Sequence, residues 1–274
     1  MISANDAWRR ILDEVSLGAI VTPRGIETRE LLAYQSRVWM GSPLLTVSER
    51  NLSYRFAAAE ALWILTGDNR LGPLINHAPS YGRFSDDGRT LDGAYGPEVV
   101  TQLRYVVDCL CLESQTRQAV LTIWRKNPRP SKDIPCTISM QFLLRANLLH
   151  CVVNMRSSDS WLGWPYDIFS FTMIASYVGL LYTKNMNCPI QLGMLTLNSG
   201  SQHIYQSNYE KVAKIISRAT MERDISTYVL THLNSPDHLL VCLGNVRDTP
   251  NKSCHVKFFD DMGSMVSIKE GIPT

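Results

Sequence analysis

The most informative segment of this chain spans residues 156–168 and reads Arg156-Ser157-Ser158-Asp159-Ser160-Trp161-Leu162-Gly163-Trp164-Pro165-Tyr166-Asp167-Ile168. An arginine beside a serine can grip a phosphate, because the guanidinium group offers a planar pair of donors and the hydroxyl group offers another. Gly163 and Pro165 predict a tight turn, and the apolar residues 167–181 predict a long helix after it. By itself, the polar start of the segment is also typical of a solvated surface turn.

A candidate nucleophile, Cys136, lies upstream in the apolar run Asp133–Phe142, which reads as a buried strand. A lone cysteine in such a strand is more often a packed core residue than a catalyst. A catalytic thiol needs nearby positive charge to favour the thiolate, and a route to the substrate. Pro135 removes one hydrogen-bond donor from the strand directly before the thiol, which weakens the purely structural interpretation.

The bulk properties indicate an ordinary globular protein. The 274 residues are 45% hydrophobic and 19% charged, and the net charge of +2 gives no strong case for binding nucleic acid or an acidic membrane. Seven cysteines without a CxxC pair and six histidines without metal spacing predict reduced thiols and no metal. No apolar stretch is long enough to span a membrane, and the N-terminus has no signal-peptide pattern, so we expect a cytoplasmic protein.

Hydrophobic spacing predicts a mixture of helices and strands. Helices are expected over residues 4–16, 52–65, 97–112, 167–181 and 209–220. Strands are expected over residues 31–40, 119–124, 140–144, 148–155 and 190–197 and in the run that ends at His203-Ile204-Tyr205, with a hairpin turn at Arg145-Ala146-Asn147. Residues 72–96 and the basic stretch 125–133 read as loops, and the tail as short strands and turns. The pattern predicts one α+β domain over residues 1–274, with a mixed β-sheet covered by helices.

Other polar residues are weaker candidates on their own. Glu60 lies mid-helix among small apolar residues, where it either faces solvent or is buried for proton transfer. His203 and Tyr205 share one face of an extended segment, and could hold a sugar hydroxyl or simply pack together. Arg24 and Arg117 could extend a phosphate site, although an isolated arginine is more often a surface charge.

Five motifs occur in one order: residues 59–68 (AEALWILTGD), Tyr95-Gly96, Pro135-Cys136 with Gln141-Phe142, residues 156–168, and His203-Ile204-Tyr205. Together they resemble the thymidylate synthase superfamily. The resemblance implies a sheet-to-sheet homodimer in which Arg117, on the loop Thr116-Arg117-Gln118, crosses to the partner. It also implies a pyrimidine nucleoside monophosphate as substrate and 5,10-methylenetetrahydrofolate as co-substrate, with no metal and no nucleic acid.

The resemblance assigns roles to individual residues. Cys136 would add to C6 of the pyrimidine, Glu60 would move protons through ordered water, and Tyr95 would lie where the C5 proton leaves. The substrate-binding residues it implies are Arg24, Arg117, Arg156, Ser157, Gly163, Asp167, His203 and Tyr205, with Asp167 also counted as catalytic. The folate-binding residues it implies are Asp159, Tyr81 and Phe84.

Departures from the family pattern point to the substrate. Synthases that act on uracil nucleotides carry asparagine at the position of Asp167, whereas a carboxyl group fits the reversed hydrogen-bonding edge of cytosine. Thr137 replaces the histidine that usually follows the nucleophile, and Gln118 replaces a second arginine. Tyr81 and Phe84 stand where methyl-forming members carry tryptophans, so Tyr81 could orient water. These departures resemble the deoxycytidylate hydroxymethylase branch known from phages, which implies a possible viral source and a role in DNA modification.

Several alternatives stay open at this stage. Within the same family the chain could methylate dCMP, hydroxymethylate CMP, or act on dUMP as a thymidylate synthase. In a different class, it could be a catalytically silent homologue that binds nucleotide or RNA through the basic residues Arg125, Lys126, Arg129 and Lys132. A solvated surface loop is the simpler interpretation of that basic stretch. The tail after Ser253 does not resemble the family's C-terminal lid.

Overall fold

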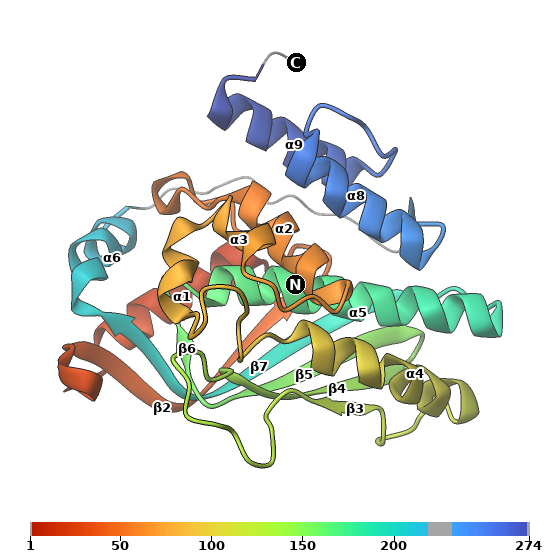
Figure 1. Ribbon diagram of the computed structural model, residues 1–274, viewed down its shortest axis with the longest axis horizontal. Helices are drawn as coiled ribbons and strands as arrows, with labels where there is room; N and C mark the ends of the chain where they lie inside the picture. Colours follow the sequence, from red (N-terminus) through yellow and green to blue (C-terminus); the bar gives the residue numbers. More distant parts are fainter. Residues whose placement is uncertain (1, 219–231, 273–274) are drawn as a thin grey trace.

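The computed structural model describes residues 2–218 and 232–272, which form a mixed β-sheet with helices packed on it (Figure 1). The strand order is β1-β2-β7-β5-β4-β3, and β6 also pairs with β7. The strands are β1 (Ala19–Val21), β2 (Thr28–Trp39), β3 (Val120–Thr122), β4 (Thr137–Arg145), β5 (Leu148–Met155), β6 (Ser158–Asp159) and β7 (Gln191–Tyr205). The helices are α1 (Ala4–Ser16), α2 (Tyr54–Leu65), α3 (Gly72–Ile75), α4 (Gly96–Leu112), α5 (Trp164–Met186), α6 (Tyr209–Ile216), α8 (Pro236–Asp248) and α9 (Lys257–Glu270). The α+β class is as predicted.

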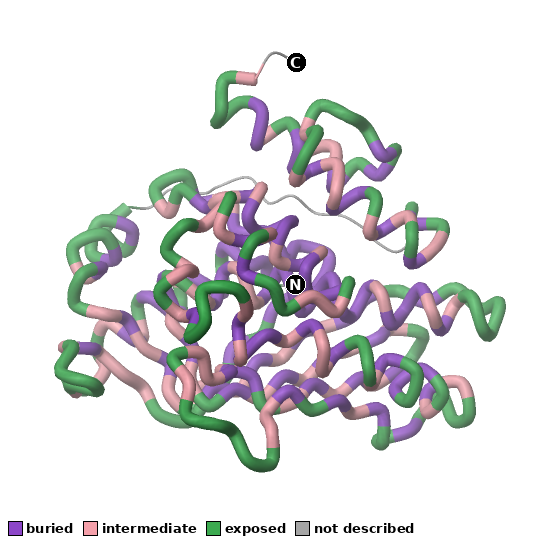
Figure 2. The backbone as a smooth tube through the Cα atoms, in the orientation of Figure 1, coloured by how far each residue is buried: buried purple, intermediate pink, exposed green. Residues whose placement is uncertain are grey.

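Helix α5 organises the core. Strands β5 and β7 pair in parallel, and parallel neighbours need a crossover connection, which α5 provides. The helix is buried on nearly all sides, as Figure 2 shows by its largely purple course. It lies on the sheet, with α2 packed on it and the pair α8 and α9 beyond α2 (Figure 1). The opposite face of the sheet carries half-buried side chains, as the alternating burial along β5 shows.

The hairpin between β4 and β5 brings Cys136 beside Arg156. Its turn residues Ala146 and Asn147 both have positive φ, 47° and 63°, which suits the right-handed twist of a two-residue hairpin. The register that starts at Arg145 and Leu148 holds as far as Ser139 and Asn154. A β-bulge between Thr137 and Ser139 then shifts it, so that Thr137 lies opposite Met155. At that open end the Arg156 N–H donates to the Cys136 carbonyl oxygen at 2.9 Å. The turn sets the register of the hairpin, and the bulge next to Cys136 then brings the nucleophile beside the arginine.

The structure corrects several predicted elements. Cys136 lies at a bend directly before β4, and not within a strand. The two predicted strands that end at Leu197 and Tyr205 are one continuous strand, β7. The predicted loop 72–96 contains α3 and a 3-10 helix, Pro79–Phe84. Helix α6 ends at Ile216, and the end of the predicted helix, residues 219–220, lies outside the described residues.

The tail is helical, so the prediction of short strands and turns was wrong there. Ser235 caps α8 by accepting the His238 N–H, and Pro236 occupies the first turn, where it costs no hydrogen bond. The buried residues of α9 recur at helical spacing, for example Phe259, Met262 and Val266. Among the described residues, no helix combines the length and the apolar character that crossing a membrane requires.

Candidate functional site

The thiol of Cys136 is held by the polar start of the 156–168 segment. The Ser157 hydroxyl donates to the Cys136 sulfur at 3.7 Å, and Arg156 Nη1 donates to the same hydroxyl at 3.1 Å. Arg156 also donates to the carbonyl oxygens of Pro135 and Ile134 at 3.0 and 2.9 Å, which fixes its guanidinium beside the nucleophile. Burial raises the pKa of the Cys136 thiol, while the Arg156 charge and the Ser157 hydrogen bond oppose that rise. The arrangement offers a partly desolvated thiol whose charged form has two supporting groups.

Glu60 occupies the middle of α2 and binds two hydroxyl groups. Tyr81 donates to Glu60 Oε1 at 2.7 Å, and Ser170 donates to Glu60 Oε2 at 3.4 Å. Burial raises the pKa of Glu60 to about 6, although both hydrogen bonds work in the opposite direction. A carboxyl group that titrates this close to neutrality is suited to proton transfer. The sequence did not single out Ser170, but its i, i+3 spacing from Asp167 on α5 is a signal that could have found it.

Asp167 lies in the first turn of α5, close to the bare backbone of Gly163. A Cβ atom on Gly163 would stand 3.4 Å from Asp167 Oδ2, so glycine leaves this side of the carboxyl group free of a side chain. Burial raises the pKa of Asp167 well above its usual range, and the negative charges of Glu60 and Asp159 add to the rise. The raised pKa favours the protonated form of the carboxyl group, which can donate as well as accept a hydrogen bond.

Tyr95 and Thr137 lie close to Cys136 and to the buried carboxyl groups. Tyr95 directly precedes α4 and stacks on Phe171 of α5, with the ring centroids 6.5 Å apart. Burial raises the pKa of Tyr95, and negative charge on Asp167, Cys136 and Glu60 raises it further, which places the four groups in one cluster. Within the described residues, the fully buried Thr137 hydroxyl lies near Tyr95 without a well-formed hydrogen bond. We call Cys136, Glu60, Tyr95 and Asp167 the thiol–carboxyl cluster.

A second group of polar side chains forms around the end of β7. The rings of His203 and Tyr205 are in contact edge to face, with centroids 5.1 Å apart, so they share one face as predicted. Arg24 Nη2 lies 3.5 Å from the Tyr205 hydroxyl oxygen, from a turn in which Arg24 has a φ of 54°. These residues bring a cation, an imidazole and a phenol together at the C-terminal end of β7.

Asp159 is tied to the turn that precedes α5. Its Oδ1 atom accepts the Trp161 and Leu162 N–H groups at 2.8 and 2.9 Å, and β6 pairs it with His203. Burial raises the pKa of Asp159 despite these hydrogen bonds. Arg50, which the sequence did not indicate, donates to the Trp161 carbonyl oxygen at 2.8 Å and stacks over the Trp161 ring. No sequence pattern identified Arg50, because it is a single charge in an irregular segment.

Arg117 is not brought to the thiol–carboxyl cluster of its own chain. Its carbonyl oxygen accepts a hydrogen bond from Gln141 Nε2 at 2.8 Å, and its side chain is exposed. Gln141 is five residues from Cys136 along an extended strand, which separates them by roughly 15 Å. Arg117 therefore does not contact Cys136 within the same chain.

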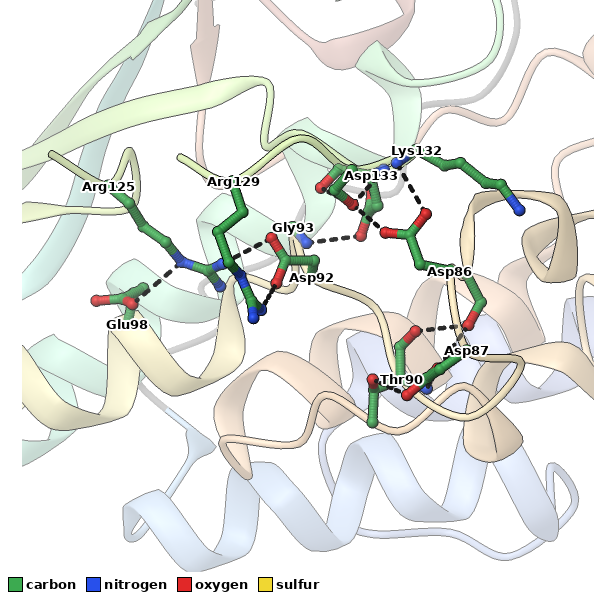
Figure 3. A network of polar contacts seen from close by, with 12 residues as sticks. Asp86, Asp87, Thr90, Asp92, Gly93, Glu98, Arg125, Arg129, Lys132 and Asp133 are labelled. Carbon is green, nitrogen blue, oxygen red and sulfur yellow. Dashed lines mark hydrogen bonds and ion pairs between the residues drawn. The ribbon is translucent and has the colours of Figure 1, made fainter. Parts of the chain in front are cut away.

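The basic loop 125–133 is held against an acidic segment that leads to Tyr95 (Figure 3). Arg125 and Arg129 both bind the Asp92 carboxylate, at 3.0 and 2.5 Å, and Arg125 also reaches Glu98 at 3.6 Å. The Gly93 N–H donates to Asp133 at 2.8 Å. Because these arginines are paired within the chain, the loop offers less positive charge to RNA than its sequence indicates.

The cluster combines a thiol, two carboxyl groups with raised pKa values and a nearby phosphate-type cation site, which suits covalent addition to an electron-poor ring. The family described as Thymidylate synthase matches residues 5–238 of the chain. Curated relatives include thymidylate synthases from the Francisella tularensis subsp. holarctica strains OSU18 and LVS. Each is 26% identical over 221 residues, covering 71% of this chain and 77% of the relative.

Enzymes of this family are one-carbon transferases that act on a pyrimidine nucleoside monophosphate with methylenetetrahydrofolate, and they are homodimers. The match covers most of the chain and includes every residue of the thiol–carboxyl cluster. The chain therefore belongs to the thymidylate synthase family.

Proposed function

We propose that the chain is a folate-dependent deoxycytidylate 5-hydroxymethyltransferase, acting as a homodimer on dCMP. The observation that carries the proposal is Asp167, a carboxyl group whose pKa is raised well above its usual range by burial within the thiol–carboxyl cluster. Cytosine presents an acceptor at N3 and a donor amine at C4. A carboxyl group with one proton matches both. The same two hydrogen bonds form whether the proton is on the carboxyl group or on N3.

A proton shared between Asp167 and N3 of cytosine would also favour the covalent step. A proton at N3 withdraws electrons from the ring, which favours addition of the Cys136 thiolate to C6. The new S–C6 bond makes C5 a carbon nucleophile. Once C5 has bonded to the one-carbon unit, loss of the C5 proton would release the folate amine as tetrahydrofolate and leave an exocyclic methylene group. Addition of water to that carbon and elimination of Cys136 from C6 would then restore the aromatic ring and the free thiol. Glu60 is the group that we assign to these proton transfers, because its raised pKa lets it both accept and release a proton near neutrality.

The residues assigned to the co-substrate fit a flat, polar heterocycle. Asp159 is a buried acceptor in the turn before α5, and Tyr81 and Phe84 form an aromatic pair with centroids 5.9 Å apart. When bound, methylenetetrahydrofolate supplies the one-carbon unit. Arg24, Arg156 and Ser157 would bind the 5′-phosphate, with Arg117 of the partner protomer, and His203 and Tyr205 would hold the sugar.

Hydroxymethyl is the product that Tyr81 favours. Its hydroxyl group donates to Glu60 at 2.7 Å, so a hydroxyl–carboxyl pair stands where methyl-forming members carry tryptophan. Such a pair can hold a water molecule and take its proton as the water attacks the one-carbon unit at C5. A hydride transferred to the same carbon would give a methyl group and oxidise the folate to dihydrofolate.

Product analysis tests the proposal. With dCMP and methylenetetrahydrofolate, we expect 5-hydroxymethyl-dCMP by mass spectrometry, with no rise in dihydrofolate absorbance. Parallel reactions with CMP and dUMP measure the choice of sugar and base. Turnover of dUMP alone would contradict the role of Asp167, and 5-methyl-dCMP with dihydrofolate would contradict the role of Tyr81. Absence of tritium release from C5 of dCMP would instead support a catalytically silent homologue.

Replacing Glu60 with glutamine is expected to lower kcat by about 10²- to 10⁴-fold, because glutamine keeps the shape but carries no titratable proton. In the wild-type enzyme, activity that depends on ionised Glu60 should fall as the pH drops below about 6. The pH profile of kcat, measured beside the exposed Glu113→Gln control, checks both expectations. An unchanged profile in the Glu60 variant would remove this residue from the mechanism.

A further inference from the structure

The C-terminal helix pair contains a cluster of metal-ligating side chains outside the thiol–carboxyl cluster. His238 and Cys242 lie one turn apart on α8, and Cys254 lies in the segment between α8 and α9. One ligand atom from each of the three residues lies within 4.8 Å of the other two. The family match ends at residue 238, so this cluster is not accounted for by the one-carbon chemistry.

We propose that His238, Cys242 and Cys254 bind a zinc ion that fastens α8 to the start of α9. Two thiolates and an imidazole are the donor types that zinc takes in proteins. Bond lengths of about 2.3 Å to sulfur and 2.0 Å to nitrogen place tetrahedral ligands roughly 3.5 Å apart. The three side chains therefore need to move by only about 1 Å to close on the ion.

The surroundings hold each ligand in place. Cys242 is fully buried, and only 6% of the Cys254 surface is exposed. The His238 ring is oriented by a 2.9 Å contact between Nε2 and the Cys254 carbonyl oxygen. Metal-bound histidines usually make such a contact through the ring nitrogen that does not bind the ion. The other nitrogen, Nδ1, accepts the Asn234 N–H at 3.4 Å, a long hydrogen bond that the ion would replace. Because His238 is only half-buried, an ion and a water molecule as fourth ligand can enter from its side.

The loop around Cys254 is also fixed by its neighbours. Asp260 of α9 accepts the Cys254 N–H at 2.9 Å and the Ser253 hydroxyl at 2.8 Å. The next residue, His255, has a φ of 62°, and its N–H donates to the Ser253 hydroxyl at 2.9 Å. A carboxylate that fixes the backbone beside a ligand is a common support in metal sites.

The arrangement explains why sequence spacing did not reveal this site. His238 and Cys242 are four residues apart on a helix, and Cys254 follows after an irregular segment, so no CxxC pattern marks it. The helix pair lies against α2, which carries Glu60. Arg55 of α2 donates to the Arg247 carbonyl oxygen of α8 and pairs with Glu270 of α9 at 2.6 Å. A zinc ion would therefore stabilise the packing of α8 and α9 against α2, the helix that carries Glu60.

Zinc content of the purified full-length protein tests the proposal. Under reducing conditions we expect about one zinc per chain by mass spectrometry of the metal, as for a site with three protein ligands and a water molecule. The variants Cys242→Ser, Cys254→Ser and His238→Gln should each lose at least about tenfold of this content. The exposed Cys188→Ser variant is the matched control and should retain it.

Two further measurements cover the case in which a variant folds poorly. Adding cobalt to the metal-stripped wild-type protein should give the charge-transfer absorption of thiolate-bound cobalt. Adding zinc should then displace the cobalt and remove this absorption. A chelator should lower the melting temperature of the wild-type protein and leave that of the Cys242→Ser variant unchanged. Wild-type protein that takes up neither zinc nor cobalt when reduced would overturn the proposal. So would a Cys242–Cys254 disulfide in peptide maps of protein prepared under reducing conditions, or equal zinc content in the variants.

Discussion

Replacing Cys136 with serine is expected to abolish turnover of dCMP, with a fall in kcat of at least about 10⁴-fold. A serine hydroxyl group ionises far less readily than a thiol, so the weak support from Arg156 and Ser157 cannot make it a nucleophile. Release of tritium from C5 of dCMP and the yield of product measure the loss. Binding of dCMP, measured by calorimetry, should change little, because the residues assigned to phosphate and sugar are intact.

The exposed Cys188→Ser variant is the control for this substitution, and should keep wild-type activity.

The Cys136 variant also tests whether Arg117 acts across a dimer. For this test the Cys136→Ser variant is mixed with an Arg117→Ala variant, and the dimers are dissociated and re-associated. The mixture should show about one quarter of wild-type activity, because half of the dimers contain both variants and each of these has one intact site. Activity of the Cys136→Ser variant within tenfold of wild type would remove the thiol from the reaction. No recovery in the mixture would place Arg117 outside the partner's site.

The sequence predicted the site best where local chemistry sets the geometry. The hairpin turn at residues 145–147 was recognised from its residues, and the register that follows from it holds as far as Ser139 and Asn154. The β-bulge that then brings Cys136 beside Arg156 was not predicted. The shared face of His203 and Tyr205 follows from the two-residue period of a strand, and their rings are in contact. The turn and the two-residue strand period are short-range rules that carry over to the tertiary structure, whereas the bulge beside Cys136 follows from neither rule.

Prediction failed where packing between distant segments decides the outcome. The tail forms helices because its apolar residues pack against α2, a contact that no local pattern reveals. Ser170 becomes a partner of Glu60 only because α5 lies on α2. Arg50 is positioned by its hydrogen bond to the carbonyl oxygen of Trp161, a residue far along the chain. The raised pKa of Asp167 likewise depends on burial and on two carboxylates from other elements. Such features require the assembled core, and not the segment alone.

Replacing Asp167 with asparagine is expected to shift the ratio of kcat/KM for dCMP to that for dUMP by about 10²- to 10⁴-fold in favour of dUMP. The magnitude follows from two mispaired polar groups at about 1–3 kcal/mol each. Asparagine can accept from N3–H of uracil and donate to O4, but it has no proton to transfer to N3 of cytosine. Competition between the two nucleotides in one reaction measures the ratio directly. An unchanged preference for dCMP would show that the choice of base lies elsewhere.

The Asp167→Asn substitution is expected to stabilise the ligand-free protein, although it impairs the use of dCMP. Melting temperature therefore tests the burial of Asp167 independently of base recognition. The pKa of Asp167 is raised in the folded protein, so its contribution to stability is present below its unfolded pKa and is lost as the pH rises through the folded value. Asparagine does not ionise and avoids this loss. The variant without ligand should therefore melt at a higher temperature than wild type at pH 8, and the difference should shrink at pH 4. Equal melting temperatures at both pH values would mean that the Asp167 carboxyl group is solvated. A solvated carboxyl group would not hold a proton at the cytosine edge, and the predicted change in substrate preference would then lose its basis.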